Sequence, residues 1–407
     1  MSILKNVKVI GSGAAGNKAA IQLIEEGIVN STNVLLINSA IKDIPEKYRD
    51  NAICLNDDIK GEGSGKERNR AKQLVHDAIM DNKLDLAKFV DPGTDIVIGI
   101  GSNGGGTGSG SIPYIGSYLT TYVDTSDSET IPEEERVTVN YHIIALNGFG
   151  NDIREFKNTV DFFKDVDEDF VVEVIDNSKF LSECGGSELQ AQRLANDEVC
   201  RRVRRLIGMD LIDCEQNIDH TDLYKTVTCP GYMTIETRNL NDIKIKNVDT
   251  FNQIITEMID ESKSMDINSA SQKRLAVMLN IPKASEPFID YGFNVIKQRL
   301  GTCFEVFSHI QFTEDSGKEP FISFISSGLK MPIEEIKKTY DKYREETAKV
   351  NKAEDNFFEQ IEQMESSEED DMFDLSSRKK KKKKDFLSEF GNNTKPVNVV
   401  IKKSYDV

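Results

Sequence analysis

Three glycine-rich segments in the first part of the chain have the composition of loops that bind phosphate. They read GSGAAGN at residues 11–17, KGEGSGK at residues 60–66 and GGGTGSG at residues 104–110. Backbone N–H groups can point together at an anion only where no side chain intervenes, and glycine tolerates the positive φ that such a concave loop needs. The three segments therefore predict a site for the phosphates of a nucleotide.

Two familiar nucleotide motifs do not account for these segments. The first segment lacks a Lys after Gly16, and Lys66 in the second is followed by Glu67, so neither fits the Walker A pattern. A dehydrogenase would need an acid to hold a ribose diol where Asn38 stands, which argues against a nicotinamide-dependent oxidoreductase. The GxGxxG pattern of the first segment could also serve packing in a tight turn, so its meaning depends on the third segment.

The elements that would position these loops alternate along the first half of the chain. The predicted strands are residues 7–10, 34–37, 96–100, 137–146 and 170–175, and the predicted helices are residues 17–26, 67–81 and 152–164. This alternation predicts an α/β fold with a parallel sheet. Because the carboxyl ends of parallel strands share one edge, all three glycine segments are expected to converge on one nucleotide.

The second half of the chain has a different organisation. Ser187 and Gln190 have capping-box spacing ahead of apolar residues at helical intervals, which predicts a long helix linking two domains. Beyond it, helical patterns mix with strands predicted at residues 303–312 and 320–325, which indicates an α+β region. The predicted divisions are a nucleotide-binding domain at 1–186, a central helix at 187–211, a second (activation) domain at 212–330, a C-terminal helix at 331–365 and a charged flexible tail at 366–407.

Composition limits the partners that the chain can have. The formal net charge of -18 argues against a body that coats nucleic acid, since such binding relies on concentrated Lys and Arg. The exception is the run RKKKKKK at residues 378–384. The six cysteines form no CxxC pair and there are four histidines, so neither a zinc site nor a disulfide framework is predicted. With no long apolar segment, the sequence predicts a cytoplasmic protein without membrane insertion.

Taken together, these motifs resemble one family. GGGTGSG is similar to the signature loop of the tubulin/FtsZ superfamily of GTP-dependent filament proteins, and GSGAAGN is similar to its first nucleotide loop. VIDNSKF resembles the strand whose Asn contacts ribose, here Asn177, and LANDEV resembles the central-helix pair whose Asn reads the guanine edge, here Asn196. An amide offers both a donor and an acceptor, which suits hydrogen bonding to guanine. The resemblance implies binding of GTP or GDP with Mg²⁺.

The resemblance also implies which residues contact the nucleotide. Arg154 matches the family's nucleotide-contacting Arg by its distance from Asn177, while no Glu stands in the place of the family's neighbouring Glu. The implied nucleotide-binding residues are Gly11, Ser12, Gly13, Ala14, Ala15, Gly16, Asn17, Asn38, Gly63, Ser64, Gly65, Gly104, Gly105, Gly106, Thr107, Gly108, Ser109, Arg154, Asn177 and Asn196.

The segment NIDHTDLYKTV at residues 217–227 resembles the family's acidic loop, which completes the active site across a subunit interface. On this resemblance Asn217, Asp219 and Asp222 are the predicted catalytic residues, with the two carboxylates orienting or polarising the attacking water. Asp219 could also cap a helix starting at His220, and the two roles are compatible.

The position of the acidic loop favours a site shared between molecules. From Asn196 to Gly208 a helix advances about 18 Å at 1.5 Å per residue, and further chain follows before the loop. The loop could not easily reach its own nucleotide but could reach that of the next molecule in a head-to-tail stack, a contact that propagates into a filament.

The end of the chain resembles that of TubZ, the family of phage and plasmid partition tubulins, whose extended C-terminal helix packs on the neighbouring subunit and whose basic tail engages a DNA-bound adaptor, TubR. This implies a GTPase that forms filaments and segregates phage or plasmid DNA in a bacterial host cytosol, with a TubR-like adaptor as partner. The lysines from Lys379 to Lys384 could also contact DNA directly or form a solubilising tail. An FtsZ-like cell-division protein and a filament that binds GTP without hydrolysing it are the alternatives.

Overall fold

The computed structural model describes residues 2–56, 63–241, 243–265 and 272–367, with side chains described as far as residue 352. One compact unit extends from Met1 to Ala348, and Lys349–Val407 forms a second. The predicted charged tail beyond Ser367, including Lys379 to Lys384, and the start of the second glycine segment at Lys60 lie outside the described residues.

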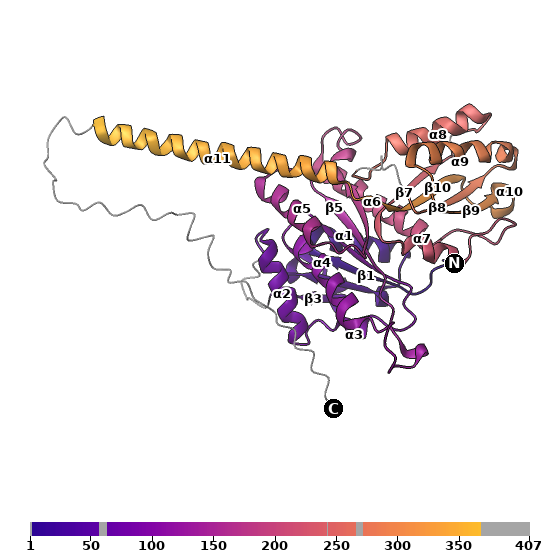
Figure 1. Cartoon of the computed structure of the whole chain (residues 1–407), viewed down its shortest axis with the longest axis horizontal. Coiled ribbons are helices and arrows are strands. Elements are labelled where there is room, and N and C mark those ends of the chain that lie inside the picture. Colours follow the sequence, from indigo (N-terminus) through magenta and orange to yellow (C-terminus); the bar gives the residue numbers. More distant parts are fainter. Residues whose placement is uncertain (1, 57–62, 242, 266–271, 368–407) are drawn as a thin grey trace. The chain divides into compact units, whose positions relative to one another are not determined.

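The first unit is built on a ten-stranded sheet in the order β3-β2-β1-β4-β5-β6-β7-β10-β8-β9 (Figure 1). The strands from β3 to β7 are parallel, β10 runs antiparallel to both of its neighbours, and β9 is parallel to β8. The strands are β1 (Val7–Ser12), β2 (Val34–Asn38), β3 (Ala52–Cys54), β4 (Ile96–Ser102), β5 (Tyr141–Asn147), β6 (Val171–Asp176), β7 (Gly231–Asn239), β8 (Arg274–Ile281), β9 (Glu305–Phe312) and β10 (Phe321–Leu329).

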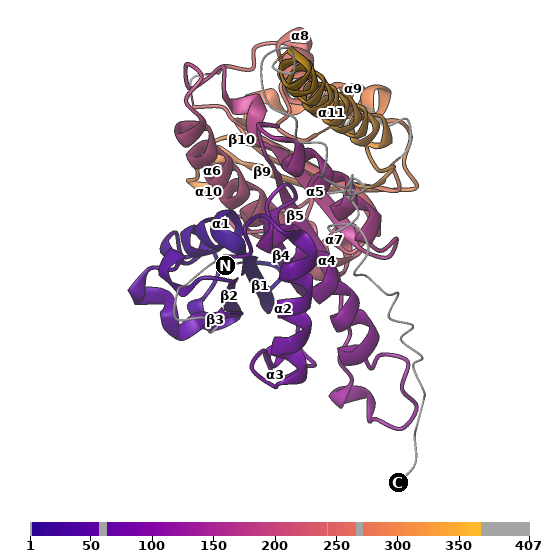
Figure 2. The same cartoon turned by 90° about the vertical axis from the view of Figure 1, so that its left-hand side faces the viewer.

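Helices cover both faces of this sheet, so its parallel strands are buried on both sides as such strands require (Figure 2). One core packs under α2, α4, α5, α8 and α9, and the other under α1, α6 and α7. The helices are α1 (Gly13–Glu25), α2 (Arg68–Met80), α3 (Leu86–Phe89), α4 (Thr107–Tyr118), α5 (Ile153–Asp165), α6 (Glu188–Leu206), α7 (His220–Val227), α8 (Val248–Asp260), α9 (Ile289–Leu300), α10 (Thr313–Ser316) and α11 (Ile333–Ser367).

The α/β fold with a parallel sheet is confirmed, but several elements differ from the sequence prediction: β3 and α3 were not predicted, and β5 and α4 differ for reasons that the structure explains. Strand β5 begins at Tyr141 rather than at residue 137, because the backbone N–H groups of Val137 and Val139 bond to side chains of a preceding loop. Helix α4 was not predicted, since its glycines and proline have poor helix propensity. Its glycines allow close packing instead: a Cβ on Gly110 would lie 2.4 Å from the Arg68 carbonyl oxygen of α2.

A buried charge cluster ties the central helix α6 to the sheet. The Arg202 guanidinium is 2.5 Å from Glu173 on β6, 2.6 Å from Glu198 and 3.5 Å from Glu236 on β7. The His142 imidazole of β5 lies 3.8 Å from the second oxygen of Glu173. Burial raises the pKa of Glu173 to about 7, and burial lowers the pKa of His142 to about 3. These contacts connect α6 to β5, β6 and β7, which are neighbouring strands of the sheet.

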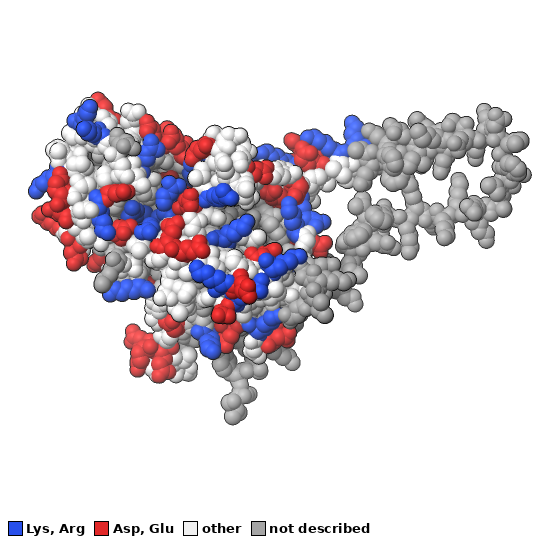
Figure 3. Space-filling view, turned by 180° about the vertical axis from the view of Figure 1, so that it is seen from behind, with Lys and Arg blue, Asp and Glu red and all other residues white. Residues whose placement is uncertain are grey.

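Within the described part of the chain, no helix combines the length and apolarity needed to cross a bilayer. On the face of the molecule shown in Figure 3, acidic and basic side chains are interspersed.

Candidate nucleotide-binding site

A pocket of about 300 Å³ opens at the carboxyl ends of β4 and β5, within the size range of small-molecule sites. The first and third glycine segments reach it together, as the parallel sheet predicts. Its lining residues are Ala14, Ala15, Lys18, Lys66, Ser102, Gly104, Gly105, Leu146, Gly148, Phe149, Asn151, Glu155, Asn177, Glu188, Gln192 and Asn196.

Two helices present bare N-termini at this pocket. Helix α1 follows Ser12, whose hydroxyl bonds to Ser111 at 2.5 Å instead of capping the helix, and α4 follows Gly106, which has no side chain to do so. By contrast, side chains cap α5, α6, α7 and α8. The uncapped N–H groups and the helix dipoles make these two termini suited to an anion.

Other glycines of the same segments pack elements together rather than line the pocket. A Cβ on Gly16 would lie 2.1 Å from the Ile100 carbonyl oxygen, so this glycine lets α1 rest directly on β4. A Cβ on Gly108 would lie 2.8 Å from the Ser102 backbone nitrogen. Gly11 is crowded in the same way by Ala20, and Gly13 has the positive φ of 71° that the strand-to-helix turn requires.

A hydroxyl network behind the pocket joins the second glycine segment to the third. The Ser39 hydroxyl lies 3.0 Å from the Thr107 hydroxyl and accepts a bond from the Ser64 backbone N–H at 3.0 Å. The Ser64 and Thr107 hydroxyls are 3.2 Å apart. Asn38 bonds to Asp43 and to the Ser39 N–H. Asn38, Ser64 and Thr107, which were predicted to touch nucleotide, therefore hold the loops in place together with Ser39.

Polar clamps fix the second segment from the side of α5. The Lys66 ammonium is 2.5 Å from Asp152, and its hydrogen bond is the main cause that holds the pKa of that carboxyl below its usual range. The Asn158 amide donates to the carbonyl oxygens of Lys66, Gly104 and Gly105. Lys66 itself adopts a φ of 60°, a conformation that a non-glycine residue holds only under such constraint.

Several other predicted contacts are accounted for by interactions within the protein. The Arg154 guanidinium donates to the Gly65 carbonyl oxygen at 2.9 Å, so it clamps the second segment and is not in the pocket lining. The buried Ser109 hydroxyl donates to the Gly106 carbonyl oxygen at 3.2 Å. Asn17 donates to the Ile37 carbonyl oxygen at 3.1 Å and joins α1 to β2. Gly63 is exposed at the start of its segment.

Two asparagine amides are available to a ligand. The Oδ1 atom of Asn177 is buried without a hydrogen-bond partner among the described residues, and the residue is 8% exposed. Asn196 is half-buried and reaches the same pocket from α6. Because a buried acceptor without a partner is costly, Asn177 fits a site whose occupant supplies a donor such as a hydroxyl.

The sequence reasoning missed part of the lining. Glu188 and Gln192 precede Asn196 at four-residue intervals, so one face of α6 borders the pocket, and this spacing was visible in the sequence. Glu155 was missed because its role depends on the fold: its carboxyl accepts the N–H groups of Gly150 and Asn151. The other lining residues that were not predicted as site residues are Lys18, Lys66, Ser102, Leu146, Gly148, Phe149 and Asn151.

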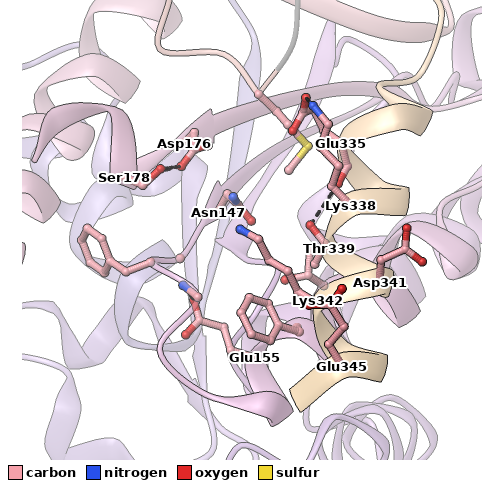
Figure 4. Close-up of a pocket in the computed structure, with 16 residues that line it drawn as sticks. Asn147, Glu155, Asp176, Ser178, Glu335, Lys338, Thr339, Asp341, Lys342 and Glu345 are labelled. Atoms are coloured by element: carbon pink, nitrogen blue, oxygen red, sulfur yellow. Dashed lines mark hydrogen bonds and ion pairs between the residues drawn. The ribbon is translucent and has the colours of Figure 1, made fainter. Parts of the chain in front are cut away.

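A second cavity, of about 460 Å³, lies beside the first and shares Gly148, Phe149 and Glu155 with it. Residues of α11 between Glu335 and Glu345 form its other wall, and Lys342 points from this helix toward Asn147 of β5 (Figure 4). The loop after β5 therefore separates the candidate nucleotide pocket from the start of α11.

The predicted catalytic residues lie at the opposite edge of the sheet. Asp219 caps α7, accepting the Asp222 backbone N–H at 2.8 Å. The next residue, His220, bonds at 2.9 Å to Asp95, which directly precedes β4. Asp219 and Asn217 are exposed and Asp222 is half-buried. The structure thus does not bring this loop to the pocket of the same molecule.

The chain is similar in sequence to one curated protein. No family model matches the chain. The chain is 24% identical to the cell division protein FtsZ of Mycoplasmopsis pulmonis (strain UAB CTIP), over 80% of this chain and 77% of that protein.

Solved structures share the fold at low sequence identity. TubZ from Clostridium botulinum phage c-st is 17% identical, with a TM-score of 0.60, covering 84% of this chain and 98% of that one. A GTPγS-form protofilament of TubZ from Bacillus thuringiensis serovar israelensis is 16% identical, with a TM-score of 0.65, covering 86% and 94%. A GTPγS-bound protofilament of CetZ2 from Haloferax volcanii has a TM-score of 0.66 at 16% identity, covering 85% and 100%. The chain therefore has a tubulin/FtsZ-like fold, and its sequence is similar to that of an FtsZ.

Proposed function

We propose that this protein is a GTP-dependent, filament-forming GTPase whose active site is completed between subunits. One observation carries the proposal: the candidate nucleotide pocket and the acidic loop lie at opposite edges of the same sheet. The pocket follows the carboxyl ends of β4 and β5, whereas α7 contacts Asp95 and Asn140, the residues that precede these strands.

The separation between pocket and acidic loop supports a reaction shared between two molecules over one within a single molecule. Strand β4 has seven residues, which at about 3.3 Å each place the two edges about 20 Å apart. A second copy stacked head to tail would present its acidic loop to the open pocket of the first, and repetition of that heterologous contact builds a filament. Two neighbours of known structure are protofilaments, which agrees with such stacking.

Each of the two stacked subunits would contribute a different part of the active site. The N-termini of α1 and α4 and the glycine backbone would bind the phosphates, while Asn177 would accept from the ribose and Asn196 would bond to the guanine edge. Asp219 and Asp222 of the adjoining subunit would orient the attacking water and accept its proton.

Mg²⁺ is the expected metal, because it binds nucleotide phosphates with few protein ligands and neutralises their charge.

For the cellular role we propose segregation or positioning of phage or plasmid DNA in a bacterial host cytosol. The TubZ structures among the neighbours and the basic run near the C-terminus support this role, with a TubR-like adaptor as partner of that run. Charges on the visible face are mixed and the net charge is -18, which favours contact through the C-terminal run over contact through the body (Figure 3). Cell division is the second candidate, because the curated relative is an FtsZ.

Right-angle light scattering of the full chain with Mg²⁺ and GTP, with phosphate release followed in parallel, tests the biochemical proposal. GTP should produce scattering above a threshold concentration together with phosphate release, and GDP and ATP should not. Assembly without phosphate release would identify a non-hydrolysing filament, and the absence of both assembly and nucleotide binding would refute the proposal. In cells, movement with a replicon or recruitment to a mid-cell ring separates the two roles.

A further inference from the structure

A separate polar pocket, distinct from the two cavities described above, lies at the C-terminal end of α6. It encloses about 310 Å³ and shares no lining residue with the nucleotide pocket. The last turns of α6, the end of β7 and the segment leading into β10 form its walls. The lining residues are Arg201, Arg204, Arg205, Asp210, Thr237, Asn239, Lys318, Glu319 and Phe321.

The charge of this pocket is opposite to that of the whole chain. Four of the lining side chains are cationic and two are carboxylates, a surplus of two positive charges in a protein whose net charge is -18. Arg201 pairs with Glu198 at 2.7 Å, and Arg204 pairs with Asp210 at 3.3 Å. Arg205 and the Lys318 ammonium form no ion pair with a carboxylate anywhere in the described ranges.

Arg205 is the central cation. Its side chain is almost fully buried, its residue being 9% exposed, and its guanidinium stacks 3.7 Å from the centroid of the Phe321 ring. One nitrogen donates to the Met209 carbonyl oxygen at 3.3 Å. Burial lowers the pKa of Arg205 to about 10, which still leaves it charged near neutral pH. Asp210 is the nearby carboxylate, but it forms its ion pair with Arg204, so an anion in the pocket would offset the cost of burying Arg205.

We propose that this pocket binds a dianionic phosphoryl group, carried either by inorganic pyrophosphate or by a small phosphate ester. Guanidinium groups are planar forks that match phosphate oxygens bidentately, and here three of them border one cavity. The surplus of two positive charges matches a dianion. The cavity volume leaves room beyond a single phosphate, which favours a phosphorylated small molecule over the free ion.

The pocket is placed to influence the acidic loop. Asp210, which Arg204 holds, has a φ of 71° and begins the segment that runs to Asn217. A bound anion would compete with Asp210 for Arg204 and alter the start of that segment. This consequence rests on the proposed GTPase function, whereas the binding itself does not.

Isothermal titration of the full chain, with one equivalent of GDP present to occupy the nucleotide pocket, tests the binding. Inorganic pyrophosphate and ribose 5-phosphate are the two probes, and citrate is the carboxylate control. We expect at least one probe to bind and citrate to bind more weakly. The probe that binds more tightly identifies the source of the phosphoryl group.

Substitutions inside and outside the pocket test where the probe binds. Arg204→Gln and the exposed Lys318→Gln should each weaken the probe roughly tenfold or more, as loss of a charge-assisted hydrogen bond implies. Arg193→Gln, an exposed arginine of α6 outside this pocket, should leave the affinity unchanged. Asn196→Ala, in the nucleotide pocket, should leave it unchanged as well.

The proposal would be overturned by no heat with either probe at millimolar concentration, by equal binding of citrate, or by a loss of affinity in Asn196→Ala alone. Because heat of binding is the readout, a chain without GTPase activity would still give a clear answer. A folded Lys318→Gln variant with full probe affinity would also count against the assigned pocket.

Discussion

Asp219 has an observed role as a helix cap and a proposed role in catalysis, and two substitutions distinguish them. Its carboxylate accepts the Asp222 N–H at 2.8 Å as the N-cap of α7, and it is the proposed catalytic group toward the next subunit. Asn caps a helix about as well as Asp, whereas Ala costs about 1 kcal/mol at such a position. Asp219→Asn should therefore keep the stability of the chain, and Asp219→Ala should lose about that amount.

The rate of GTP hydrolysis should depend on the negative charge at position 219 and not on the hydrogen bond that caps α7. Loss of a group that moves a proton lowers a rate by about 10²–10⁴-fold. We expect both Asp219→Asn and Asp219→Ala to bind GTP normally, to hydrolyse it more slowly by this factor and to form longer-lived polymer. Equilibrium nucleotide binding, phosphate release and light scattering measure the three quantities. Rapid GTP hydrolysis by Asp219→Asn would show that Asp219 acts only as the cap of α7 and not in catalysis.

Mixing variants tests whether the site is shared between molecules. Asp219→Asn keeps an intact nucleotide pocket, and Asn196→Ala keeps an intact acidic loop. The assay uses a GTP concentration that fills the wild-type pocket but leaves the weakened Asn196→Ala pocket largely empty, so that each variant alone is nearly inactive. In a random equimolar filament about a quarter of the contacts pair an intact pocket with an intact loop, so the mixture should recover about a quarter of the wild-type rate. Activity no greater than the average of the two separate variants would contradict a composite site.

Three further changes test the fold and the pocket. Gly16→Ala places a Cβ 2.1 Å from a backbone oxygen and should destabilise the chain by about 3 kcal/mol, seen as a lower melting temperature, whereas Gly27→Ala meets no atom within 4 Å and should cost about 1 kcal/mol. The pKa of Glu173 is raised to about 7, so its contribution to stability is present at low pH and is lost as the pH rises through that value, by up to about 1.4 kcal/mol per pH unit. Glu173→Gln should therefore gain stability relative to wild type between pH 5 and pH 8 in urea denaturation; parallel pH profiles would refute this assignment. Asn196→Ala should weaken fluorescent GTP binding roughly tenfold or more through lost base hydrogen bonds, while Arg193→Ala on the same helix should not.

Local patterns predicted much of the first half of the chain. Apolar runs separated by glycine turns and helical periodicity identified β1, β2, β4 and β6, because these strands are buried on both faces and read as continuous apolar segments. Helix α4 escaped prediction, since it is stabilised by close packing of its glycines and not by helix propensity.

The second half of the chain contains a long-range strand pairing that local sequence patterns do not predict. Its strands were recognised as an α+β region, but their continuation of the first sheet through β7 was not predicted. Pairing between β6 and β7 joins residues 60 positions apart, as in Val171 opposite Gly231. Such a contact leaves no periodic signal in either segment, because it depends on which surfaces remain to be buried after each has folded locally.

The sequence by itself determined the chemistry that the protein can offer: glycine segments whose backbone can bind phosphate, amides that can read a base, and an acidic loop after the central helix. These properties are local, since residue type sets the allowed φ and the available donors and acceptors. The tertiary structure decided their arrangement. It turned Arg154 toward the Gly65 carbonyl, placed Lys318 beside the arginines at the end of α6, and placed Asp219 at the opposite edge of the sheet from the pocket, because strand direction and packing fix which ends of distant segments meet.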